Sequence, residues 1–214
     1  MNDPSFQRRQ ATRGLEQLAH LVRAQSWRQD GTPSLPPTQS AVLRMLEGTA
    51  DGMRARQIAE RLGVSPASLS ESLKAMEGKR WIRRTPDPDD ARAARVRLTA
   101  AGSRMATRLQ RPDQGMGPLV EALGEADLGA LLRVTQLLVN QAQEQGLATG
   151  LRTCLGCEFF RPFASGERDA PHVCAFLGKA FGDAELRVDC PEQRPADDAR
   201  RSGSVVRFRQ QTPP

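Results

Sequence analysis

The segment that decides the fold is ARQIAERLGVSPASLSESLKAMEGKRWIRRTPDPDDARAARVRLT, residues 55–99. Its first eight residues carry an apolar stripe of helical period that stops at Gly63, a residue suited to a tight turn. A Ser-Pro pair beginning at Ser65 is a typical helix start, and the helix that follows has a buried stripe formed by Leu69, Leu73 and Met76. Polar and apolar residues then alternate on both sides of the turn PDPDD, which predicts a β-hairpin.

The order helix, turn, helix and hairpin is typical of a winged helix-turn-helix, which we place in residues 38–99. Outside it, apolar residues spaced three and four apart predict helices in residues 5–29 and within residues 100–146. Aromatic residues make up only 4% of the chain and Tyr is absent, which disfavours a large β-sandwich or barrel. We therefore expect a mainly α fold.

Basic residues are concentrated in the winged segment. The chain has a net charge of +6 and a pI of about 9.9, which indicates an acidic partner such as nucleic acid or an anionic surface. Residues 54–99 contain 11 Lys or Arg and 6 Asp or Glu, so they carry +5 of that excess. Most of these cations are Arg, whose planar guanidinium suits phosphates and guanine edges, although genomic base composition alone also favours Arg.

Three stretches resemble the MarR family: ARQIAERLGVS at 55–65, DPDDAR at 87–92 and VRLTAAG at 96–102. The resemblance covers about residues 5–146. It implies a homodimer whose dimerisation region is formed by helices in 5–29 and 100–146, and which reads pseudo-palindromic double-stranded DNA. It also implies a small-molecule effector, although the sequence does not indicate whether a pocket for one exists. One departure is Arg80, where the family usually has Gly, so that Gly78 is expected to end the preceding helix.

The second helix of the motif would place its N-terminal half in the major groove. With its apolar stripe buried, the opposite face carries Ser hydroxyls that can contact base edges or phosphates, and an Ala that can contact a thymine methyl. Glu71 fits only by accepting a hydrogen bond from cytosine or by pairing with a basic neighbour. The residues that we predict to contact DNA here are Ser65, Ala67, Ser68, Ser70, Glu71 and Lys74.

The wing adds four arginines to this predicted interface. The resemblance implies that Arg92, at the wing tip, enters the minor groove and is held by nearby Asp residues. Arg83, Arg84 and Arg95 would flank the DNA backbone. A solvated basic hairpin without a partner is the alternative for these residues. For the whole chain the alternative is a winged-helix protein–protein interaction module with a structural zinc site.

All four cysteines lie in one C-terminal segment: Cys154, Cys157, Cys174 and Cys190. The polar N-terminus predicts no signal peptide, and no stretch is apolar enough to span a membrane, so we expect a cytoplasmic protein with reduced thiols. A C-x-x-C turn followed by two further thiols suits a soft metal. The sequence therefore predicts a small, loop-rich, four-cysteine metal-binding module in residues 150–194.

The spacing leaves this metal open between Zn²⁺ and an iron–sulfur cluster, either [4Fe-4S] or [2Fe-2S]. Structural zinc sites often use two C-x-x-C pairs and only one is present, whereas a final Cys followed by Pro, as at Cys190, is also found in cluster proteins. The module would brace the protein or sense metal or redox state. His172 is a candidate to replace one thiol, and four uncoordinated thiols or disulfides are the remaining alternative.

Five of the seven Phe residues lie in the cysteine segment, and we expect them to pack around the metal because so small a module has little other core. Residues 195–214 are polar and basic, which predicts a disordered tail. The only two histidines, His20 and His172, lie in no recognisable catalytic context, so we do not expect an enzyme.

Overall fold

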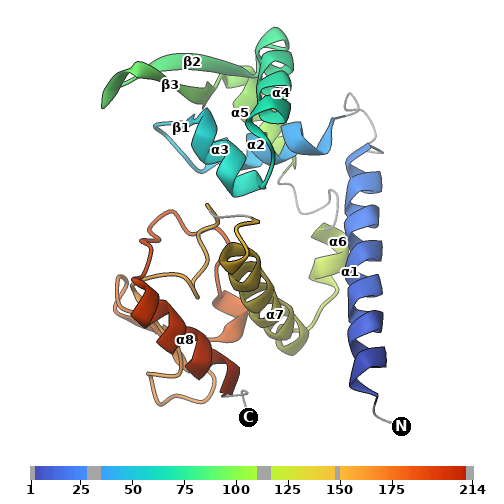
Figure 1. Cartoon of the computed structure of the whole chain (residues 1–214), viewed down its shortest axis with the longest axis vertical. Helices are drawn as coiled ribbons and strands as arrows, with labels where there is room; N and C mark the ends of the chain where they lie inside the picture. Colours follow the sequence, from blue (N-terminus) through green and yellow to red (C-terminus); the bar gives the residue numbers. More distant parts are fainter. Residues whose placement is uncertain (1–2, 28–34, 110–116, 148–149, 211–214) are drawn as a thin grey trace. The chain divides into compact units, whose positions relative to one another are not determined.

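The computed structural model describes residues 3–27, 35–109, 117–147 and 150–210 (Figure 1). The chain divides into two units. The first contains residues 1–54 and 67–121, and the second contains residues 55–66 and 122–214. In the part of the chain that is described, no helix is both long and apolar enough to cross a membrane.

The predicted winged helix-turn-helix is present. Its elements are α2 (Pro37–Glu47), β1 (Met53–Arg54), α3 (Ala55–Leu62), α4 (Pro66–Gly78), β2 (Ile82–Asp87), β3 (Asp90–Leu98) and α5 (Ala100–Leu109). The strands form an antiparallel sheet in the order β1-β3-β2, and α2 packs against α5 and β3. Both hairpin strands extend into the Pro- and Asp-rich turn, which the sequence predicts as a loop. The two-residue strand β1 is too short to show a period.

The apolar stripe of α4 is buried as predicted. Leu69, Leu73 and Met76 are each at most 1% exposed, and Val42 of α2 and Val96 of β3 are fully buried. Thr99 caps α5, because its Oγ1 accepts a hydrogen bond from the N–H of Gly102 at 3.1 Å. A Cβ at Gly102 would collide with the carbonyl group of Trp81, so this position requires Gly.

α4 ends at Gly78, as the sequence predicts, but Gly78 is not the residue that turns the chain after the helix. The left-handed residue after the helix is Arg80, with φ of 56°, and Gly78 is not among the positive-φ glycines. The N–H of Trp81 donates to the carbonyl of Met76 at 3.0 Å, which closes the last turn as in a Schellman motif. The chain therefore holds an Arg in a conformation that glycine adopts at lower cost.

Two helices of the first unit have largely exposed apolar faces. α1 (Pro4–Trp27) exposes Leu15, Leu18 and Leu21 by 48–50%, and α6 (Gly117–Glu121) exposes Leu119 by 58%. Residues 28 and 29 of the predicted first helix lie outside the described residues. An amphipathic helix gains most of its stability from packing its apolar face. These faces are therefore suited to a partner that the single chain does not supply.

The second unit surrounds a core of its own. Besides α3 it contains α7 (Glu125–Glu144), β4 (Phe160–Arg161), β5 (His172–Cys174), β6 (Lys179–Phe181), the 3-10 helix η1 (Asp183–Glu185) and α8 (Asp198–Gln210). The three short strands form an antiparallel sheet in the order β4-β5-β6. Its buried apolar cluster consists of Leu155, Cys157, Phe160, Phe181, Leu186, Val205 and Phe208, with Leu132 and Leu137 of α7 packed against it.

His172 stands within this core. Its side chain is fully buried, its Nε2 lies 2.7 Å from Oδ1 of Asp183, and its Nδ1 accepts the N–H of Phe163 at 3.3 Å. The rings that contact it belong to Phe160, Phe163, Phe181 and Phe208. Both ring nitrogens are thus engaged, and four aromatic rings gather around a histidine. Phe160 and Phe181 also line the cavity of the four cysteines, together with Phe159 and Phe176, so the Phe residues of this segment pack both around His172 and around the cysteines.

The prediction of a disordered tail over residues 195–214 is wrong for residues 198–210. This stretch is α8, which Figure 1 shows beside α7, and Phe208 is fully buried in the core of the unit. Asp197 begins the helix by accepting the N–H of Arg200 at 2.8 Å. Arg133 of α7 lies 4.2 Å from the centroid of the Phe208 ring and donates to the Phe208 carbonyl. Residues 211–214 lie outside the described residues.

Candidate nucleic-acid interface and cysteine cavity

The exposed face of α4 carries the side chains that the sequence predicts. Apolar residues at positions 69, 73 and 76 are buried, whereas the remaining candidates lie at the surface: Ser65 just before the helix, then Ala67, Ser68, Ser70, Glu71 and Lys74. The helix is therefore oriented as its periodicity requires. Contact of these residues with DNA stays a prediction.

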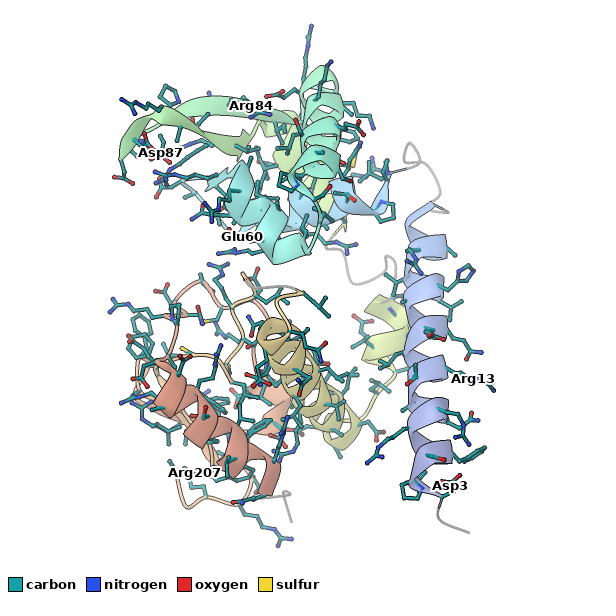
Figure 2. The ribbon with its side chains drawn as sticks, in the orientation of Figure 1. Asp3, Arg13, Glu60, Arg84, Asp87 and Arg207 are labelled. Atoms are coloured by element: carbon teal, nitrogen blue, oxygen red, sulfur yellow. The ribbon has the colours of Figure 1, made fainter. Side chains whose placement is uncertain are left out.

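A buried carboxylate organises the wing. Asp87, labelled near the turn of the hairpin in Figure 2, is 3% exposed and accepts the Nε–H of Arg54 at 2.6 Å and that of Arg95 at 3.0 Å. It also accepts the backbone N–H of Asp89 at 2.9 Å. The hydrogen bond from Arg54 is the main cause that holds the pKa of Asp87 well below its ordinary value. Asp87 thus joins β1, β2 and β3 as an ionised group.

This arrangement changes the role of Arg95. Its guanidinium bonds Asp87 and also lies 2.9 Å from Asp89, and its side chain is only 21% exposed. The hydrogen bond to Asp87 raises the pKa of Arg95. The structure gives Arg95 a bracing role inside the wing, and its contact with the DNA backbone stays a prediction. The sequence analysis also missed Arg54, because nothing local shows that a residue 33 positions away is its partner.

The other wing arginines are at the surface. Arg83 and Arg92 are exposed, and the N–H of Arg92 donates to Oδ1 of Asp90 at 3.0 Å, which fixes the backbone just after the turn. The Nε of Arg84 lies 2.8 Å from Oε1 of Glu77, with the Arg84 side chain 43% exposed. Arg83, Arg84 and Arg92 therefore lie at the surface of the hairpin, whereas Arg95 is engaged with Asp87.

The four predicted metal ligands line one cavity. Cys154, Cys157, Cys174 and Cys190 all lie on the wall of a space of about 330 Å³ in the second unit. None of them is in a disulfide. His172 does not line this cavity, so the structure places it in the core rather than among the ligands. The remaining wall is largely apolar and includes Phe159, Phe160, Phe176, Leu177 and Phe181.

The thiols are held by their backbone surroundings. The N–H of Cys157 donates to the carbonyl of Cys154 at 2.9 Å, which forms the C-x-x-C turn, and the N–H of Arg187 donates to Sγ of Cys154 at 3.3 Å. Burial raises the pKa of the Cys154 thiol to about 11, and the Cys190 thiol adds to this effect. Without a metal, Cys154 would therefore be a protonated and poorly reactive thiol at neutral pH.

The chain segment that carries Cys190 also contacts α3. Asp189 accepts the Nε–H of Arg152 at 2.8 Å, and its Oδ1 lies 4.0 Å from a guanidinium nitrogen of Arg61, in the last turn of α3. The backbone passes close to the same arginine, because a Cβ at Gly150 would lie 3.0 Å from the backbone nitrogen of Arg61. The sequence gives no signal for this contact.

Comparisons with known proteins agree with the winged helix. Residues 34–93 match the model of the MarR family, and no curated protein matches the chain. The transcriptional regulator SlyA has a TM-score of 0.57 and 19% identity over 64% of this chain and 96% of its own. The repressor CouR, bound to a 23-mer DNA duplex, has a TM-score of 0.52 and 26% identity over 59% and 89%. PcaV from Streptomyces coelicolor, in complex with its natural ligand, has a TM-score of 0.51 and 22% identity over 66% and 98%.

The fold and the exposed basic hairpin define a winged helix-turn-helix protein. Residues 34–93 match the MarR family of transcriptional regulators, and the solved regulators share the winged-helix fold. Members of that family are non-enzymatic DNA-binding proteins, which confirms the prediction that the chain is not an enzyme. The match covers nearly the whole length of each of the three solved structures. About a third or more of this chain lies outside it.

Proposed function

We propose that this protein is a homodimeric transcriptional regulator that binds pseudo-palindromic double-stranded DNA through its winged helix. The observation that carries the proposal is the wing itself, in which a buried Asp87 braces the hairpin while Arg83, Arg84 and Arg92 stay at the surface. The likeness to CouR, whose structure contains a DNA duplex, supports the same function.

In this proposal the exposed face of α4 lies in the major groove. The hydroxyls of Ser68 and Ser70 and the ammonium of Lys74 contact base edges and phosphates. Arg92 enters the neighbouring minor groove, where the electrostatic potential favours a guanidinium. Arg83 and Arg84 contact phosphates, which adds affinity that is independent of sequence and sensitive to salt. Glu71 accepts from a cytosine amine.

The exposed apolar faces of α1 and α6 support the homodimer. A second copy of the chain would cover Leu15, Leu18 and Leu21, which stay about half exposed in the single chain. One face of α7 has the same character, with Val134 exposed by 52% and Leu138 by 46%. Two winged helices related by a two-fold axis would read half-sites of opposite orientation. A small-molecule effector stays a prediction.

The cysteine module is the second part of the proposed function. Four thiols that line one cavity, with a backbone N–H directed at one sulfur, suit a bound metal or cluster. The site either braces the second unit or senses metal or redox state. The contact of Asp189 with Arg61 of α3 favours a sensor, since it joins the cysteine segment to the first helix of the helix-turn-helix.

The binding part of this proposal can be tested by fluorescence anisotropy with a labelled duplex over a range of salt concentrations. We expect binding at low salt and a linear fall of the logarithm of affinity with the logarithm of salt concentration. Analytical ultracentrifugation of the same sample should give a dimer. A chain that binds no duplex at low salt would contradict the proposal and would favour a protein–protein interaction module.

A further inference from the structure

We infer that the cysteine cavity binds a four-iron iron–sulfur cluster, with Cys154, Cys157, Cys174 and Cys190 each bonded to one iron. The inference deepens the metal-binding part of the proposed function and does not depend on DNA binding. It chooses between Zn²⁺ and the two cluster types that the sequence leaves open.

The size of the cavity favours a cluster over a single ion. In a four-thiolate zinc site each sulfur lies about 2.3 Å from the metal, so the sulfurs nearly touch one another. Here the four cysteines are among the residues that line a space of about 330 Å³, which is larger than a single ion needs. Among the described residues, no three His, Cys, Asp or Glu side chains converge closely enough to hold one metal ion. Thiols that share one wall without meeting at a point suit several irons, with one thiolate for each.

Hydrogen bonds between chain segments that are far apart in sequence build the wall. The N–H of Cys190 donates to the carbonyl of Arg152 at 2.9 Å, and the N–H of Cys154 donates to the carbonyl of Arg187 at 3.1 Å. Cys174 lies on β5 opposite Phe160 of β4. The core around His172 adjoins the cavity, since Phe160 and Phe181 belong to both, and it supports these segments. These hydrogen bonds position Cys154 and Cys190 on the cavity wall.

Polar groups at the cavity suit an anionic cluster. Thr153 is 1% exposed and lines the cavity, and its Oγ1 has no hydrogen-bond partner among the described residues. Leaving a buried hydroxyl without a partner is costly, and a cluster sulfur would accept a hydrogen bond from it. Lys179 and Arg187 also line the cavity, where Glu185 and Glu192 balance their charge, and the rings of Phe159 and Phe176 pack against each other on its apolar wall. On binding, each thiol releases its proton to solvent and its sulfur bonds to one iron of an assembled cluster.

The cluster would also position the segment that touches α3. Cys190 follows Asp189, which bonds Arg152 and lies 4.0 Å from Arg61. Loss of the cluster removes the bond that fixes Cys190 and so loosens Asp189 against α3. DNA affinity should therefore differ between the cluster-bound and the cluster-free protein.

The test is metal analysis of the full chain, purified anaerobically and reconstituted with iron(II) and sulfide. We expect about four irons and four sulfides per chain and the Mössbauer spectrum of a four-iron cluster. Cys174→Ser should lose most of the iron. Glu192→Gln, at another residue of the same lining, should keep it. Far-UV circular dichroism of both variants should match the parent chain, which excludes unfolding as the cause of any loss of iron.

One zinc per chain without sulfide would overturn the inference, as would about two irons per chain or a metal-free protein after reconstitution. Full retention of iron by Cys174→Ser would exclude that residue as a ligand and would overturn the four-cysteine set. These outcomes are independent of the duplex titration. Failure of the cluster assignment therefore leaves the DNA-binding proposal standing, and the reverse also holds.

Discussion

In the winged helix, the buried side chains lie on elements whose periodicity is visible in the sequence. In the cysteine-bearing unit, the buried side chains come from segments that are far apart in the sequence. Leu69, Leu73 and Met76 are all on α4, but the core around His172 joins Leu132 of α7 to Phe208 of α8. The first region is specified by local pattern and the second by long-range contact. A short polar-looking segment can therefore be essential to the second region without showing it in sequence.

The largest effect is expected at Phe208, in the core of the second unit. Phe208→Ala should destabilise the second unit by about 3–5 kcal/mol, because a fully buried ring and its contact with Arg133 are lost. Urea denaturation followed by circular dichroism measures the change. The matched control is Val206→Ala in the same helix, where the side chain is 52% exposed and the expected change is below about 0.5 kcal/mol. Equal effects of the two substitutions would mean that α8 does not pack as described.

At the wing, Arg92→Ala should weaken duplex binding about tenfold and make the salt dependence shallower, since one cation leaves the interface. Anisotropy titrations at several salt concentrations measure both. Arg108→Ala removes an equal charge from the exposed surface of α5 and should change affinity less. If Arg108→Ala has the larger effect, net charge and not the wing determines binding.

The ion pairs of Asp87 predict that the stability of the folded chain depends on pH. Because the folded-state pKa of Asp87 is lowered from 3.8, its stabilising contribution is complete above that value and is lost as the pH falls below it. Asp87→Asn should therefore lower stability at neutral pH, and its difference from the parent chain should shrink in strong acid. Denaturation midpoints from pH 7 downward measure this. Asp89→Asn, at a 74% exposed carboxylate, should have a smaller effect at every pH. A difference between Asp87→Asn and the parent that does not change with pH would contradict the ionised brace.

The smallest expected effect is at Arg80. Arg80→Gly should stabilise the winged helix by about 1 kcal/mol, because φ of 56° is strained for any residue with a Cβ. Thermal unfolding should show a rise of about 2–4 °C. Arg80→Ala removes the same charge but keeps the Cβ, so it should leave the midpoint nearly unchanged. A gain from Arg80→Ala as large as that from Arg80→Gly would assign the effect to charge and not to backbone strain.

Local signals in the sequence predicted the winged helix well. The stripe at Leu69, Leu73 and Met76 fixed both the extent of α4 and the face that it exposes, because helical period links burial to position. The ends of the hairpin strands were less predictable. Pro and Asp are typical of turns, so the sequence did not indicate that β2 continues to Asp87 and that β3 begins at Asp90. The bracing role of Arg95 depends on a carboxylate buried by the fold, which no spacing rule reports.

The second unit was predictable only in its thiols. All four cysteines of the chain lie in one segment, which marked the site, and the structure places them at one cavity. α8 was missed because only Val205, Val206 and Phe208 interrupt a polar stretch. The contact of Asp189 with Arg61 links residues 128 positions apart, and such a pair has no signature in a single sequence.

DNA selection followed by hydroxyl-radical footprinting tests the central claim most directly. The full chain would be used to select duplexes from a random library, and the enriched duplex would then be footprinted. The account predicts an inverted repeat with two protected half-sites about 10 base pairs apart, and weaker protection next to each half-site when Arg92 is replaced by Ala. Enrichment of no sequence, with no protected region at low salt, would contradict it.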